Sequence, residues 1–175
     1  MLAFEDFARV KILCRDFIRN ISRRARTNLT QGDRNVSKGL YRSLKGEQIV
    51  NENVIEVNFT YSDYGDYQDQ GIKGWKSSMK APQSPFKYKK KLANFKAIRG
   101  WVGARRFQFR NKKTGVFMSY DSTAFLIARS IAAKGIEATR WFSEAVDKYL
   151  PTFTKDFLDK YARDLEDFET NKLNN

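Results

Sequence analysis

The sequence predicts an α+β fold with a long N-terminal helix, a small antiparallel sheet and packed C-terminal helices. Apolar residues recur every three or four positions near both ends of the chain, and they alternate with polar residues around positions 55–61. The chain has 175 residues, of which 41% are hydrophobic, enough to bury the core of one ordinary domain. We therefore expect a single domain over residues 1–169 and a loose C-terminal tail at 170–175.

The first predicted helix spans residues 3–29. Its apolar residues are spaced alternately by four and three positions, which places them on one helical face: Ala3, Phe7, Val10, Cys14, Phe17 and Ile21. Because Cys14 belongs to this row, we interpret it as a small core residue. The alternative, a reactive thiol, would have no histidine partner, since the chain contains none.

The predicted sheet follows this helix. Ile55, Val57, Phe59 and Tyr61 alternate with polar residues, as in a half-buried strand. We expect residues 40–44 to form the partner strand, with turns at 45–47 and 51–53. One face of this antiparallel sheet should pack on the N-terminal helix.

The middle of the chain reads as short elements joined by a long loop. A short helix is expected at 63–70, ending at Gly71. Residues 73–91 contain two prolines and seven lysines with little periodicity, which predicts a long exposed loop. A helix from about 92 to 102 and a second hairpin around 107–115 should follow.

Two helices are predicted in the C-terminal third. In the first, Ala124, Ile127, Ala128 and Ile131 form a small-residue face, Asp121 or Ser119 caps the start, and Gly135 stops the helix. The second carries apolar residues from 145 to 168. Pro151 should bend or break it, because proline has no amide hydrogen and its ring crowds the preceding turn.

Composition argues against several classes of protein. No stretch approaches the roughly 18 uninterrupted apolar residues of a membrane span, and Glu5 and Asp6 interrupt the N-terminus before a signal-peptide core can form. We expect no membrane association and synthesis in a cytoplasm. One cysteine cannot form an internal disulfide, and the lack of histidine removes the usual zinc ligand sets. We expect neither a metal nor another cofactor.

The net charge of +13 is distributed unevenly. Residues 51–70 contain 5 Asp/Glu and no Lys/Arg, whereas residues 71–119 contain 14 Lys/Arg and no Asp/Glu. Like charges at this density repel one another, so a compact state needs them spread over solvent or facing opposite charge on another molecule. This partition predicts a binding surface.

Catalysis has one candidate site. Clustered carboxylates bind divalent cations and would suit a metal-dependent nuclease, and the candidates are Glu52, Glu56, Asp63, Asp66 and Asp69. The alternative is a solvated acidic surface beside a strand. No serine or cysteine nucleophile has a partner in the sequence, so we expect a protein that is not an enzyme.

Nucleic-acid binding is a second interpretation. Lysine and arginine between residues 73 and 113 are interleaved with aromatic residues, and cations neutralise phosphates while aromatic rings stack on bases. No motif of the common nucleic-acid-binding folds is present. The alternative is that the aromatic residues, Trp101 among them, form core and the lysines are solvated.

The helix and glycine stop before the last helix also carry a resemblance. Ala128-Arg129, Ile131 and Gly135-Ile136, followed by Trp141-Phe142, resemble a motif of the tail-component and tail-completion proteins of tailed bacteriophages. The family usually has proline where this chain has Ala138 or Thr139. Two further segments, 61–71 and 95–102, resemble the family's Tyr-rich segment and its Ile-x-x-Trp-Val helix, so the likeness covers about residues 55–145.

The resemblance implies a non-enzymatic virion structural protein of the head–tail connector or tail-completion type, which assembles as a ring around the DNA channel. Its partners would be copies of itself, portal, adaptor or tail proteins, and packaged DNA. We expect the acidic residues named above to meet basic residues of a neighbour, with Trp141 and Phe142 as aromatic anchors. The basic candidates are Lys73, Lys76, Lys80, Lys87, Lys89, Lys90, Lys91, Arg105 and Arg106.

Overall fold

The α+β class is confirmed, but the chain is divided into two compact units. A computed structural model describes residues 7–31, 38–51, 54–90 and 92–173. Unit 1 comprises residues 1–65 and 140–175, and unit 2 comprises residues 66–139. Where the sequence predicts one domain over 1–169, the structure therefore has a segment of 66–139 that packs mainly on itself.

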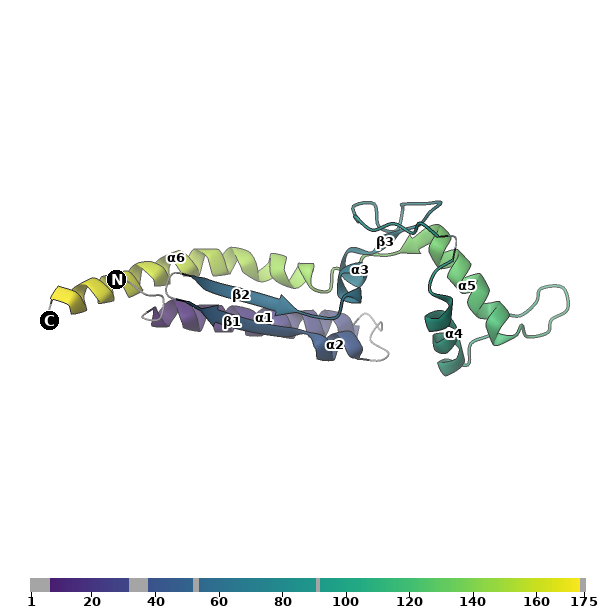
Figure 1. The fold of residues 1–175 in the computed structure, drawn as a ribbon, viewed down its shortest axis with the longest axis horizontal. Coiled ribbons are helices and arrows are strands. Elements are labelled where there is room, and N and C mark those ends of the chain that lie inside the picture. Colours follow the sequence, from purple (N-terminus) through teal and green to yellow (C-terminus); the bar gives the residue numbers. More distant parts are fainter. Residues whose placement is uncertain (1–6, 32–37, 52–53, 91, 174–175) are drawn as a thin grey trace. The chain divides into compact units, whose positions relative to one another are not determined.

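Unit 1 is built from two long helices and a hairpin. Helices α1 (Ala8–Gln31) and α6 (Ser143–Leu173) run along the hairpin of β1 (Lys45–Val50) and β2 (Ile55–Thr60), as Figure 1 shows. The strands are antiparallel, with register from Lys45 opposite Thr60 to Val50 opposite Ile55. The predicted sheet beside a long N-terminal helix is thus confirmed.

Two clusters of apolar residues form the core of unit 1. Phe7, Val10 and Cys14 of the predicted row are buried against Ile55 and Val57 of β2 and against α6. Burial raises the pKa of the Cys14 thiol, which fits a core residue. The second cluster joins Ile21, Ala25 and Leu29 of α1 to residues from the segment before β1 and from around the start of α6: Leu40, Leu44, Trp141 and Ala145. Ala3 of the row lies outside the described residues.

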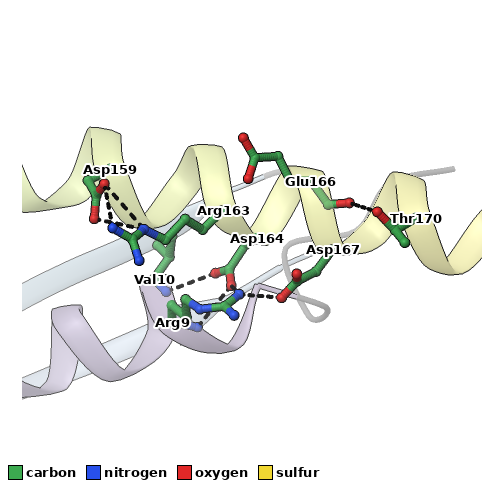
Figure 2. A network of polar contacts seen from close by, with 8 residues as sticks. All are labelled: Arg9, Val10, Asp159, Arg163, Asp164, Glu166, Asp167 and Thr170. Atoms are coloured by element: carbon green, nitrogen blue, oxygen red, sulfur yellow. Dashed lines mark hydrogen bonds and ion pairs between the residues drawn. The ribbon is translucent and has the colours of Figure 1, made fainter.

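A buried carboxylate fastens the start of α1 to α6. The Asp164 side chain is on α6, and its Oδ2 accepts the backbone N–H of Val10 at 3.1 Å, while its Oδ1 accepts the Arg9 guanidinium at 3.0 Å (Figure 2). Asp164 therefore acts as an N-terminal cap for α1 that is supplied by α6. Asp167 accepts a further hydrogen bond from Arg9 at 2.5 Å.

The first strand was predicted one element too early. Residues 40–44 fall mostly in a short helix, α2 (Gly39–Ser43), and the partner strand is β1, so the predicted turn at 45–47 is wrong. Gly46 explains the difference, because a Cβ there would lie 2.5 Å from Cγ2 of Ile18 on α1. The glycine permits close packing of strand and helix. In the predicted turn at 51–53, Asn51 N–H bonds to the Val54 carbonyl at 2.9 Å, and residues 52–53 lie outside the described residues.

Helix α6 continues where the sequence predicts interruptions. Pro151 lies inside the helix, which does not break there. Phe153, Phe157 and Tyr161, after the proline, pack on the core of unit 1 and offset the loss of one helical hydrogen bond. The tail predicted to be loose from 170 is helical to Leu173.

Unit 2 is a small α-helical unit with a two-stranded ribbon. It contains α3 (Tyr64–Gln70, which begins in unit 1), β3 (Ile72–Lys73), α4 (Phe95–Ala104), α5 (Tyr120–Lys134) and β4 (Gly135–Ile136). Strand β3 pairs antiparallel with β4. Its core is built on small side chains, with Trp75, Tyr88, Ile98 and Ile131 packed around Ala93, Ala128 and Ala132.

Helix α5 begins and ends where the sequence predicts. The Ser119 side chain accepts the backbone N–H of Ser122 at 3.1 Å, and the helix stops at Gly135, whose φ is 85°. A Cβ at Gly135 would lie 2.2 Å from the Ile72 carbonyl oxygen, so the glycine allows both the left-handed turn and the pairing of β4 with β3.

The segment after β3 is folded back on unit 2, in contrast to the exposed loop predicted for 73–91. Ala81 and Ser84 are buried, and the Ser84 hydroxyl donates to the Gly71 carbonyl at 2.7 Å. Lys73 N–H donates to the Phe86 carbonyl, and Tyr88 N–H donates to the Lys73 carbonyl, both at 2.9 Å. The lysine side chains between these anchor points are exposed.

Candidate docking surfaces

Nearly all of the net charge belongs to unit 2. Its 74 residues, 66–139, hold 16 Lys/Arg and 4 Asp/Glu, a net charge of +12, whereas unit 1 holds 17 Lys/Arg and 16 Asp/Glu, a net charge of +1. Unit 1 is therefore close to neutral and holds the large aromatic core. Unit 2 has a core built around alanines and a strongly positive surface.

The predicted basic residues all belong to unit 2. Lys76, Lys80, Lys87, Lys89 and Lys90 are exposed on the segment after β3, and Arg105 and Arg106 are exposed where α4 ends. Lys73 is half-buried on β3, and Lys91 lies outside the described residues. All of these basic residues therefore contribute to the positive charge of the same compact unit.

The predicted acidic strip is not one surface. Glu56 is on β2, and Asp63 follows it in unit 1, whereas Asp66 and Asp69 are on α3 in unit 2. Asp69 is only 5% exposed, and Glu52 lies outside the described residues. Among the residues that the structure describes, no group of three acidic or cysteine side chains is placed to hold a metal ion.

The predicted aromatic anchors serve the fold of unit 1. Trp141 is 1% exposed, and its indole N–H donates to the Gly65 carbonyl at 3.1 Å. Its ring packs edge-on against Tyr61 at 5.2 Å, and Phe142 packs against Phe59 at 5.3 Å. Trp141 is thus unavailable to a neighbouring subunit, and an aromatic anchor would have to be an exposed ring elsewhere in the chain.

Unit 2 exposes a set of large apolar side chains, three of which, Trp101, Phe107 and Phe109, are among the aromatic residues that the nucleic-acid interpretation of the sequence selects. Trp101, Phe107, Phe109 and Val116 are each between 36% and 65% exposed, and we call them the aromatic patch. The rings of Trp101 and Phe107 are 6.4 Å apart between centroids, and those of Phe107 and Phe109 are 5.2 Å apart. An exposed Trp–Phe cluster of this kind marks an interaction surface.

A short hairpin presents part of this patch. Arg110 pairs with Phe117, and Asn111 N–H donates to the Val116 carbonyl at 2.9 Å, so the chain turns at 111–115 as predicted. Because residues opposite each other share a face, Val116 lies on the face of Phe109, and Phe117 lies on the other face. Figure 1 shows this segment extending away from the N-terminal end of α5.

Arginines lie near the patch in the chain, two of them over aromatic rings that are not part of it. Arg110 lies over the Phe117 ring at 4.7 Å, and Arg99 lies over the Tyr120 ring at 5.2 Å while pairing with Asp121. Arg105 and Arg106 are exposed at the end of α4, between Trp101 and Phe107 in the chain. Aromatic residues accompanied by arginine are typical of protein interfaces.

The most acidic exposed surface is on α6 in unit 1. Between Asp156 and Glu169 the chain has 6 acidic and 2 basic residues. Asp159, Glu166 and Glu169 are exposed on the side of the helix that also carries Leu158, which is 65% exposed, whereas Asp167 lies on another side and pairs with Arg9. We call this side the outer face of α6; it consists of Leu158, Asp159, Ala162, Glu166 and Glu169, with one basic residue, Lys155.

A groove along α1 is lined by basic and uncharged polar side chains and by one tyrosine. It encloses about 480 Å³, and its lining carries no carboxylate and no thiol: Arg19, Ser22, Arg23, Arg26, Thr27, Thr30, Gln31 and Tyr41. The Arg26 guanidinium is engaged in the fold, since it donates to the Leu44 carbonyl at 2.9 Å and stacks on Tyr41.

Comparison with known proteins identifies no relative of this chain. No protein-family model matches it, and neither a curated protein nor a solved structure does. In the described part of the chain, none of the helices combines the length and the apolar character needed to span a membrane.

Proposed function

We propose that this chain is a non-enzymatic structural protein of a phage virion, of the head–tail connector or tail-completion type, and that it assembles as a ring around the DNA channel. The proposal starts from the motif order in the sequence, from the small-residue helix through the glycine stop to the aromatic pair. In the structure these residues are α5, the left-handed turn at Gly135 and the Trp141–Phe142 pair before α6.

The observation that carries the proposal is that the large core and most of the net positive charge belong to different units. A nearly neutral unit contains the large core, and a unit with a net charge of +12 exposes aromatic residues and arginines. Such a surface favours binding to anionic or complementary macromolecules. This arrangement suits a subunit that contacts copies of itself, other virion proteins and the DNA in a channel.

The location and partners follow from this role. The protein would be made in the host cytoplasm and would end in the virion, next to portal, adaptor or tail proteins. In this scheme the lysines of unit 2 face DNA or an acidic neighbour, and unit 1 provides the rigid body. No cofactor or covalent step is part of the proposal.

A charge-reversal experiment tests it. Replacing Lys87, Lys89, Lys90 and Lys91 by Glu in the phage that encodes the chain should prevent complete particles from forming, while the purified variant keeps the circular dichroism and thermal midpoint of the wild type. Lys87, Lys89 and Lys90 are exposed and outside the cores, so folding should be spared. Normal particles from this variant would contradict the proposal.

A second candidate is a sequence-nonspecific nucleic-acid-binding accessory protein, and the charge of unit 2 favours it specifically. Phosphate contacts by many lysines release counterions, so affinity for duplex DNA should fall steeply as salt rises. Strong, salt-dependent binding by a chain that is missing from purified particles would favour this candidate over the virion protein.

A further inference from the structure

We propose that the aromatic patch of unit 2 binds the outer face of α6 on a second copy of the chain, so that copies associate head to tail. The inference rests on the proposed function, because it specifies which surfaces join two subunits. It departs from the sequence prediction, in which Trp141 was the anchor and residues 52–69 the acidic partner.

The geometry of the patch favours a protein partner over nucleic acid. The ring planes of Trp101 and Phe107 are tilted by 53°, and those of Phe107 and Phe109 by 79°, so neighbouring rings cover part of each other's faces. Bases stack on open aromatic faces. Val116, the most exposed member, is aliphatic and offers no ring at all. Trp and Arg together are the commonest anchors of protein interfaces.

The charge around the patch requires an acidic partner. Every Asp, Glu, Lys or Arg residue between 71 and 119 is basic, so a positive surface would meet repulsion there, whereas an acidic surface would be attracted. The partner must also carry an apolar side chain, because the centre of the patch consists of exposed aromatic carbon. An acidic amphipathic helix has both properties.

The outer face of α6 has this chemistry within the chain itself. Leu158 is exposed next to Asp159, and the Glu166 side chain points away from α1 in Figure 2. The opposite side of α6 is occupied, since Phe153, Phe157 and Leu165 pack on the core of unit 1. The outer face is therefore a second apolar and acidic surface of the same helix.

Local charge decides the contact in spite of the total charge of +13 on each copy. At physiological salt the Debye length is about 8 Å, so exposed charges farther apart are largely screened. A pair of complementary surfaces can then associate, while the net repulsion limits non-specific clustering. Since the two surfaces differ, a pair of copies keeps one free patch and one free outer face, and association continues into a ring or a filament.

Two variants that each lose one surface test this pairing. The patch variant is Arg105→Glu with Phe107→Ala, and the α6 variant is Leu158→Ala with Glu166→Lys. Each should be monomeric by analytical ultracentrifugation at concentrations where the wild type forms oligomers. An equimolar mixture should form dimers and nothing larger, because only one productive interface remains between the two variants.

Matched controls separate a specific surface from a general charge effect. Arg15→Glu with Ile12→Ala makes the same charge change and one apolar truncation at exposed positions of α1 in unit 1, and it should associate like the wild type. If the patch variant fails to fold by circular dichroism, Arg105→Glu alone replaces it, since Arg105 is an exposed residue outside the core clusters.

Several results would overturn the inference. They are a wild type that stays monomeric at every concentration, variants that associate like the wild type, or a mixture that remains monomeric. Loss of duplex or single-stranded DNA binding in the patch variant, with self-association unchanged, would assign the patch to nucleic acid. Variants that still associate leave the proposed function standing if the chain is found in virions, whereas absence from virions removes the proposed function itself.

Discussion

Asp164 is a single residue that holds the two long helices of unit 1 together. Its carboxylate is buried, and it accepts hydrogen bonds from the backbone of α1 and from Arg9. A charged acceptor at a helix N-terminus satisfies free N–H groups and interacts favourably with the helix dipole. The two ends of the described chain are thereby tied to each other.

We expect Asp164→Asn to lower the free energy of unfolding by about 2 kcal/mol, because an amide cannot accept all of these hydrogen bonds. Asp159→Asn is the matched control on the same helix. Asp159 forms an exposed pair with Arg163, so the change should cost less than about 0.5 kcal/mol. Urea unfolding at neutral pH measures both, and equal effects would contradict the capping role.

Gln48 on β1 is a buried polar residue with unfulfilled hydrogen bonds. Both polar atoms of its side chain are buried and without a hydrogen-bond partner among the described residues. Gln48 shares a strand face with Gly46, the face that approaches α1. Gln48→Met keeps the length and removes the polar atoms, so we expect it to raise the free energy of unfolding by about 1 kcal/mol. A lower value in urea unfolding would show that the amide has a partner.

The carboxyl group of Glu144 makes the stability of the protein depend on pH. Glu144 accepts hydrogen bonds from Arg24, at 2.7 and 3.0 Å, and from Asn28. These hydrogen bonds and the positive charge of Arg24 lower the pKa of the Glu144 carboxyl from its ordinary 4.5 to about 2. Because the folded pKa is below the unfolded one, this stabilisation is present above pH 4.5 and is lost as pH falls toward 2.

We therefore expect Glu144→Gln to destabilise the protein at neutral pH by about 1 kcal/mol, a value reduced by the partial exposure of the pair. The difference from the wild type should shrink as pH falls from 4.5 toward 2. Thermal unfolding across this range checks it. A difference that does not change with pH would mean that packing, and not the charge, is responsible.

At the scale of elements, the structure of α5 was predictable because its signals are local. The Ser119 cap, the buried alanine face and the Gly135 stop are all encoded within seventeen consecutive residues. The strand β1 was misplaced because its glycine was interpreted as a turn signal. Only the position of Ile18 on α1 explains that glycine, and sequence spacing does not reveal a contact between distant segments.

Two glycines of unit 2 give opposite predictions. Gly135→Ala should destabilise unit 2 by more than about 1 kcal/mol, since its φ of 85° disfavours a side chain and the new Cβ would collide with the Ile72 carbonyl. Gly100→Ala should stabilise α4 by up to about 1 kcal/mol, because nothing lies within 4 Å of the new Cβ. Hydrogen exchange of unit 2 amides measures both, and destabilisation by Gly100→Ala would contradict the account of α4.

The candidate site was predictable only in part. The charge partition located the basic residues correctly in one segment, because charge is a property of the sequence itself. For Trp101, Phe107 and Phe109 the sequence left both base stacking and core open, since a Trp or Phe beside arginines is equally consistent with core and surface until neighbouring elements are placed. The Asp164 cap joins residues more than 150 positions apart, and no local pattern marks it.

At the scale of the whole molecule, the insertion of unit 2 between β2 and α6 gives the protein two separable tasks. Unit 1 buries the large aromatic residues and provides stability, and unit 2 carries a net charge of +12 with exposed rings. The sequence did not predict two units because no Gly/Ser-rich or Pro-rich linker marks the junctions at 65 and 139. Both crossings are short and ordered.

The most direct test of the central claim is to locate the chain in purified phage particles by gold-labelled antibody and electron microscopy. The account predicts label at the junction of head and tail or at the end of the tail, with a constant number of copies per particle. Absence of the chain from mature particles, or label confined to unassembled protein in the host lysate, would contradict it.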